Sequence, residues 1–132
     1  MAQPAARQGD PVTGTDTHIV LVPSPGGPVP TPMPLPFAGK LMSGLSTDVF
    51  VNGLPAATVN SVAQNLPPHL PPPGTSFSVP PKNAGTVLAG STTVLCNGKG
   101  LARTGDQVST CNDPADAPTS VIGPGSANVL VG

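Results

Sequence analysis

The sequence predicts an all-β domain, built from short strand repeats with pseudo-three-fold symmetry. The strongest observation is a phrase that occurs three times, with small or polar residues before a Val-centred strand, at residues 46–53, 91–98 and 126–132. Because a repeat this short cannot bury a face alone, its copies must pack on one another. The 20 prolines and 16 glycines would suit a disordered chain. However, only 8% of the residues are charged and 37% are hydrophobic, which favours a folded body with many turns.

A second phrase completes the repeat unit. It is clearest at residues 4–10, Pro-Ala-Ala-Arg-Gln-Gly-Asp, and recurs in altered form at residues 55–61 and 101–106. In two units, Asn-Gly joins the strand to this phrase, and it is a strong hairpin signal because both residues tolerate positive φ. The start of the sequence has the second phrase without a strand, and its end has a strand without the second phrase. We therefore expect residues 1 and 132 to lie side by side, so that three equivalent units close on themselves and hide their strand edges.

The charge and hydropathy of the sequence exclude several classes of partner. Five basic and six acidic residues give a net charge of −1, without a basic cluster that could bind nucleic acid. No apolar run approaches the ~20 residues of a membrane span, and residues 1–4 lack the charged and apolar regions of a signal peptide. We expect a monomer that stays in the cytoplasm until other machinery exports it, with no nucleic-acid partner and no stable membrane insertion.

Three residues occupy matched places in the repeat and are ordinary metal ligands. His18, His69 and Cys111 follow the Gly-Asp position of successive units by 8, 8 and 5 residues. Three symmetry-related loops can converge at one end of the three-fold axis, where a cation would tie them together. The sequence therefore predicts one structural metal ion per chain. The thiolate favours zinc, and iron remains an alternative.

Two further residues have open roles. Cys96 occupies a strand position that is Val51 and Val131 in the other units, so a buried small hydrophobic side chain is favoured and a fourth metal ligand is the reserve interpretation. Asp16 lies two residues before His18. Asp16 either orients the imidazole as a neighbouring carboxylate or is an exposed loop residue.

Two proline-rich segments separate the repeat halves, at residues 23–36 and 67–81. Composition alone would suggest disordered linkers or polyproline docking motifs. Since both segments lie close to the proposed ligands, we expect long loops that wrap the body. Proline stiffens such loops and lowers the entropy of the unfolded chain, which stabilises a small body.

An Arg and an Asp recur together in two of the units, as Arg7 with Asp10 and Arg103 with Asp106. They form either a contact surface for a partner or a turn held by an Arg–Asp hydrogen bond. The middle unit has Thr58 and Ser61 in their place, so neither charged residue is essential in every unit. We favour the turn.

The first of these phrases resembles the motif of the PAAR-repeat proteins, in the residues Pro4, Ala5, Ala6, Arg7, Gly9 and Asp10. Further segments resemble the PAAR-like tips of extracellular contractile injection systems and their type VI secretion relatives, at residues 17–25, 67–69 and 111–116. The resemblance covers essentially the whole chain. It implies a small conical PAAR fold over residues 1–132, as a single domain without a fused effector domain.

The resemblance also implies a function. PAAR proteins cap and sharpen a trimeric spike of the VgrG or phage-baseplate kind, one copy per trimer, and the spike is driven through a target membrane. A monomer with three similar faces matches three spike chains. The resemblance further implies a zinc ion held by three His and one Cys. One of those His falls near Leu35 here, where residues 33–37 contain no ligand. The fourth position is then filled by Cys96, filled by water or left open.

Two other functions compete with the spike tip. An adaptor that attaches separate effector cargo to the spike is the first alternative. A zinc hydrolase is the second, because two His and one Cys with an open fourth position can activate water. However, the sequence contains no Glu, and a closed cone of this size offers little room for a catalytic cleft. We expect that the protein is not an enzyme.

Overall fold

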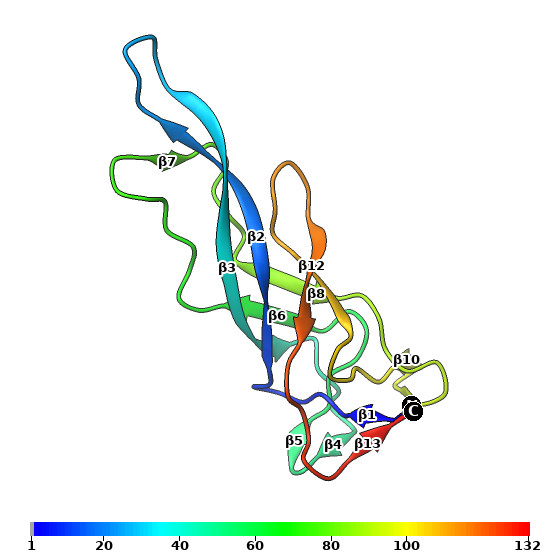
Figure 1. Ribbon diagram of the computed structural model, residues 1–132. Coiled ribbons are helices and arrows are strands. Elements are labelled where there is room, and N and C mark those ends of the chain that lie inside the picture. The colour runs from blue at the N-terminus through cyan, green and yellow to red at the C-terminus, as the bar shows by residue number, and fades with distance from the viewer. Residues whose placement is uncertain (1) are drawn as a thin grey trace.

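The computed structural model describes residues 2–132 as an elongated all-β molecule (Figure 1). Its strands are β1 (Gln3–Pro4), β2 (Pro11–Val22), β3 (Val29–Ser43), β4 (Phe50–Val51), β5 (Leu54–Pro55), β6 (Val62–Asn65), β7 (Ser76–Phe77), β8 (Ala84–Val87), β9 (Leu95–Cys96), β10 (Lys99–Gly100), β11 (Gln107–Thr110), β12 (Ala117–Ile122) and β13 (Leu130–Val131). The expected all-β class is confirmed. Within residues 2–132 there is no helix long and apolar enough to cross a membrane.

Three short strand pairs form one end of the molecule, which we call the base (Figure 1). They are β4–β5, β9–β10 and β1–β13. In the first two pairs, Asn52, Gly53, Asn97 and Gly98 all have positive φ, between 53° and 79°. These angles fit the tight hairpin that Asn-Gly predicts. The third pair joins the two ends of the chain, with Gln3 opposite Val131 and Pro4 opposite Leu130.

A ring of three backbone hydrogen bonds lies at the centre of the repeat units. The Ala6 N–H donates to Ala102 O at 2.9 Å, the Ala102 N–H to Ala57 O at 2.9 Å, and the Ala57 N–H to Ala6 O at 3.0 Å. All three side chains are 0% exposed. Because three backbones meet here, only a small side chain fits, which explains the alanine in each unit. The ring confirms the pseudo-three-fold symmetry.

The rest of the chain forms a closed barrel. The sheet order is β12-β11-β8-β6-β3-β2-β7, and β12 also pairs with β2. Six strands therefore close on themselves, and β7 adds to the outer part of β2 (Figure 1). β2, β6 and β11 each begin directly after the Gly-Asp position of one unit, so each unit contributes one strand pair to the barrel.

The buried residues form two clusters, and the alanine ring belongs to the larger one. The barrel cluster consists of Ala6, Val12, Phe37, Leu41, Ala57, Ala63, Val87, Ala102, Val108, Cys111 and Ile122. The base cluster consists of Ala5, Val51, Ala56, Cys96, Leu101 and Val131. Consecutive residues of each motif therefore belong to different clusters. Ala5, Ala56 and Leu101 pack in the base cluster, and Ala6, Ala57 and Ala102 pack in the barrel cluster.

The first proline-rich segment is a strand for most of its length, contrary to the loop expected for residues 23–36. Residues 29–40 of β3 pair with β2, with Pro32 opposite Ile19 and Pro34 opposite Thr17. The N–H groups of Thr17 and Ile19 point away from β3, to the side chains of Asn112 and Asp113. The prolines thus occupy positions where an antiparallel strand makes no bond to its neighbour, so their missing N–H costs nothing.

The second proline-rich segment is mainly a loop, as expected. Residues 67–81 contain only the short β7 and link β6 to β8. This loop runs along the side of the barrel towards the end opposite the base (Figure 1). It carries His69.

Candidate metal centre

The strand β2 positions two polar side chains inside the barrel. Asp16 and His18 lie on the same face as Val12 and Val20, because alternate residues of a strand face the same side. They are 0% and 1% exposed. His18 was expected in a loop, and the structure corrects this: the β2–β3 hairpin extends beyond His18, so the strand passes through the site.

The other two units supply a histidine and a cysteine. The His69 backbone N–H donates to Asn83 Oδ1 at 2.7 Å, which fixes the loop after β6 against the start of β8. Cys111 directly follows β11 and is 2% exposed. Each unit therefore contributes to the site, and one of the units contributes two side chains.

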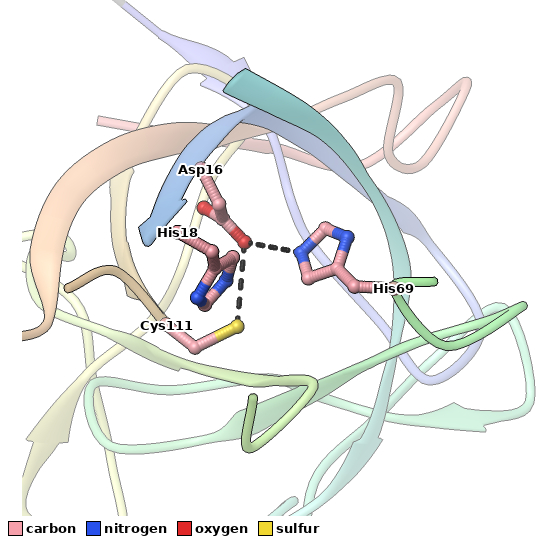
Figure 2. Close-up of side chains that lie close together, drawn as sticks. All are labelled: Asp16, His18, His69 and Cys111. Carbon is pink, nitrogen blue, oxygen red and sulfur yellow. Dashed lines mark hydrogen bonds and ion pairs between the residues drawn. The ribbon is translucent and has the colours of Figure 1, made fainter. Parts of the chain in front are cut away.

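Asp16, His18, His69 and Cys111 converge in the barrel, with candidate ligand atoms that all lie within 4.8 Å of one another (Figure 2). Asp16 Oδ2 lies 2.8 Å from His69 Nε2 and 3.4 Å from Cys111 Sγ. All four residues are buried. The structure thus brings together the three residues that the repeat singled out, and it adds Asp16, which the repeat did not identify as a ligand.

Neither ring nitrogen of His18 has a hydrogen-bond partner, although both are buried. The nearest carboxylate oxygen, Asp113 Oδ2, lies 3.5 Å from Nδ1. The ring packs against the His69 and Phe77 rings, with centroids 5.0 and 5.7 Å away. A buried imidazole without a partner is costly, and a cation among the four side chains would remove this cost. The residues present therefore fit a metal ion.

The chemistry of the four donors also fits a transition metal. In a tetrahedral zinc site with bonds of 2.0 to 2.3 Å, neighbouring ligand atoms are about 3.3 to 3.8 Å apart. The observed separations bracket this range, so small side-chain movements suffice. Imidazole and thiolate suit zinc or iron, and the carboxylate suits either.

Burial raises the pKa of the Cys111 thiol to about 11, and the negative charge of Asp16 adds to the increase. Without a cation, this thiol is therefore protonated at neutral pH. Metal ligation requires the thiolate, so binding would release a proton.

Asp16 is held in place by two hydroxyl groups. Thr110 Oγ1 and Thr119 Oγ1 donate to its Oδ1 at 2.5 and 3.2 Å. An exposed loop position, one of the two alternatives for Asp16, is wrong. The signal that could have identified Asp16 is its alternation with His18, which places both residues on one strand face.

Cys96 lies outside the group. It is 3% exposed and packs in the base cluster with Val51 and Val131. The favoured interpretation, a buried small hydrophobic side chain, fits this position. The structure gives no support to the reserve interpretation as a fourth ligand, because Cys96 and the metal group belong to different clusters.

The Arg–Asp pairs form turns. Asp10 accepts hydrogen bonds from the backbone N–H, Nε and Nη2 of Arg7, and Asp106 accepts the same three from Arg103. In the middle unit, the Thr58 N–H donates to Ser61 Oγ at 2.9 Å. The same turn is thus kept with a hydroxyl group in place of the carboxylate.

A surface hollow of about 490 Å³ lies beside the metal group, and its lining includes His18, Cys111 and Asp113. Lys82 and Asp116 also line it and form an ion pair with a 2.8 Å Nζ–Oδ2 distance. The barrel therefore has more open space next to the group than a closed cone suggests.

Comparison with known protein families finds a match in the C-terminal part of the chain. Residues 78–132 match the family described as PAAR motif, which confirms the resemblance in this region. No curated protein matches the chain. The matched region contains two of the three strand repeats and Cys111. PAAR proteins are a structural family of spike tips that associate with VgrG-type spikes, so the match supports a spike-associated role, and PAAR motifs bind metal.

Proposed function

Since residues 78–132 carry a PAAR motif, we propose that this protein caps and sharpens the trimeric VgrG-like spike of a contractile injection system. One copy sits on three spike chains. The observation that carries this proposal is the pseudo-three-fold base, because one chain that presents three similar faces resolves the mismatch between a monomer and a trimer.

The base exposes the same apolar position in each of its three strand pairs. Phe50, Leu95 and Leu130 are 57%, 64% and 62% exposed, and each precedes a buried residue of the base cluster. Exposed large apolar side chains that recur at the same position of each unit indicate an interaction surface. Its three-fold arrangement favours the blunt end of a trimeric spike over a partner without that symmetry.

The end opposite the base has a composition that suits contact with a membrane. Residues 19–39 and 70–81 contain no charged side chain, and they include exposed apolar residues such as Val29 and Val79. Alternating prolines stiffen the β2–β3 hairpin. We propose that this end leads when the spike pierces a target membrane.

The metal has a structural role in this proposal. A zinc ion held by His18, His69 and Cys111 ties the three units together at a point far from the base. Such a link stabilises the folded state by the free energy of binding. Elemental analysis should find about one metal ion per chain, and a chelator should lower the melting temperature. The structural metal would be ruled out if the purified protein contained no metal, melted cooperatively and had a melting temperature that chelator does not change.

The test of the capping proposal is co-purification with the trimeric spike protein of the same injection system. Native mass measurement should find one copy of this protein per three spike chains. The triple variant Phe50→Asp, Leu95→Asp, Leu130→Asp should lose binding, whereas Leu70→Asp, at the most exposed apolar side chain away from the base (76% exposed), should retain it. No binding to the spike by the unaltered protein would refute the proposal.

The same experiment addresses the adaptor function. If effector cargo joins the complex only when this protein is present, the protein acts as an adaptor as well as a cap. We propose no catalytic activity, and hydrolysis of common esters or peptides that disappears in His18→Ala would contradict this. We also propose that the protein remains in the cytoplasm until it is assembled, and then leaves the cell at the particle tip.

A further inference from the structure

We propose that Asp16 is itself a metal ligand, through Oδ2, so that one carboxylate, two imidazoles and one thiolate complete a four-ligand site. This inference rests on the metal binding proposed above. It concerns what fills the fourth position, which the repeat units do not supply.

The two oxygens of Asp16 have different surroundings. Oδ1 accepts hydrogen bonds from the hydroxyls of Thr110 and Thr119. Oδ2 faces the centre of the group, towards His69 Nε2 and Cys111 Sγ (Figure 2). A ligating carboxylate is typically held in this way, with one oxygen anchored by neighbouring donors and the other directed at the metal.

A carboxylate that only orients a ligating histidine lies on the far side of that ring from the metal. Asp16 Oδ2 is instead in contact with donor atoms from two different units, and the 3.4 Å distance to Cys111 Sγ is close to the edge of a tetrahedral zinc site. This position is at the centre of the group. The geometry therefore favours direct ligation over an orienting role.

The charge of the site supports the same conclusion. Asp16 is 0% exposed, and no Lys or Arg in residues 2–132 forms an ion pair with it. The ion-pair partner of Asp16 is His69, with Nε2 at 2.8 Å from Oδ2, and His69 is itself a proposed metal ligand. A buried carboxylate is normally paired or bound to a metal. Two negative ligands, Asp16 and the Cys111 thiolate, would neutralise a divalent cation, whereas two imidazoles and one thiolate alone would leave a net positive charge inside the barrel.

The register of the barrel offers a direct test. Leu35 lies opposite Asp16 in the β2–β3 pair, and opposite residues of an antiparallel pair share a face with Cβ atoms about 5 Å apart. Leu35 and His69 also line a common hollow of about 210 Å³. A histidine at position 35 could therefore replace the lost ligand from the neighbouring strand.

The experiment measures Co²⁺ binding by its visible absorption, together with competition for Zn²⁺, in four variants. Asp16→Ala and the nearly isosteric Asp16→Asn should weaken binding at least 100-fold and change the cobalt spectrum. The double variant Asp16→Ala, Leu35→His should recover at least tenfold of the lost affinity, with a spectrum shifted by the new nitrogen ligand. The matched control is Asp116→Asn, an exposed carboxylate beside the same hollow that pairs with Lys82 and contacts none of the four proposed ligands. This variant should leave the spectrum unchanged.

The outcomes separate the two proposals. If the unaltered protein binds neither Co²⁺ nor Zn²⁺, the metal function itself fails. If it binds metal and Asp16→Asn binds equally well with the same spectrum, only the role of Asp16 fails. A loss of affinity in Asp16→Asn without a change in spectrum, and without recovery in the double variant, would mean that Asp16 only orients His69 and would overturn the inference. Circular dichroism of Asp16→Asn establishes that the fold is retained.

Discussion

At the base, the three units repeat one backbone-to-serine hydrogen bond, whereas at the metal group each unit contributes differently. Ser46, Ser91 and Ser126 each accept a hydrogen bond from the backbone N–H three residues later, at 2.9 Å in every case. At the metal group, one unit gives a strand with two polar side chains, the next gives a loop histidine, and the last gives a cysteine at a strand end. The equivalence of the units thus decreases with distance from the base.

The proposed function accounts for this difference by what each end would bind. A symmetric partner is best matched by equivalent surfaces, which fits the strand repeats at the base. One ion needs four donors at one point, which three identical units cannot supply. The three units must therefore carry different side chains at the metal group. The alanine ring lies between this part of the molecule and the symmetric base.

The largest expected effect on stability comes from a substitution in the alanine ring, which lies on the pseudo-three-fold axis. Ala57→Leu places three extra carbons where three backbones meet, and should lower the free energy of unfolding by about 3 kcal/mol because the ring cannot expand without losing its hydrogen bonds. Urea unfolding measures this. Ala38→Leu, on an exposed face of β3, should change stability by less than about 0.5 kcal/mol. Equal effects at both positions would show that the axis is not tightly packed.

A slightly smaller effect on the free energy of unfolding is expected when the Cys111 thiol, in the metal group, is titrated. The pKa of Cys111 is raised to about 11 in the fold, so between pH 9 and 11 the unfolded chain loses a thiol proton that the folded chain retains. Stability of metal-free protein should therefore be unaffected by this group below pH 9 and fall by about 2 to 3 kcal/mol as the pH rises to 11. Thermal unfolding across this range measures it, and Cys111→Ser should lack this decrease.

The smallest expected effect on stability tests whether two of the repeat units are equivalent at their Arg–Asp turns. Asp10→Ala and Asp106→Ala each remove three hydrogen bonds to an Arg and should each cost about 1 to 2 kcal/mol. Because the contacts are the same, the two costs should agree within about 0.5 kcal/mol, and the double variant should show their sum. A difference of more than 1 kcal/mol between the variants would contradict equivalence of these units.

The symmetric part of the fold could be predicted from the sequence, because each of its three units corresponds to one copy of a sequence repeat. The phase of the two half-units predicted that the chain ends meet, and Gln3 does pair with Val131. The repeat also indicated which His and Cys residues converge. These predictions needed only local spacing and the count of the units.

The asymmetric part could not be predicted in the same way. Asp16 has no counterpart in the other units, and its burial depends on β11 and β12 supplying Thr110 and Thr119. The proline content of residues 23–36 predicts a loop, although most of this segment belongs to β3. The prolines of β3 alternate with inward-facing residues such as Met33 and Leu35. This period of two is typical of a strand, and composition alone does not reveal it.

The alternating prolines of β3 have a consequence for how the molecule behaves among its neighbours. Pro30, Pro32, Pro34 and Pro36 turn towards the open edge of the strand, so this edge presents carbonyl acceptors without a single N–H donor between them. A strand from another protein could make only half of the usual ladder there. The long β2–β3 hairpin can therefore project from the end opposite the base without offering, along this edge of β3, a full template for pairing with another strand.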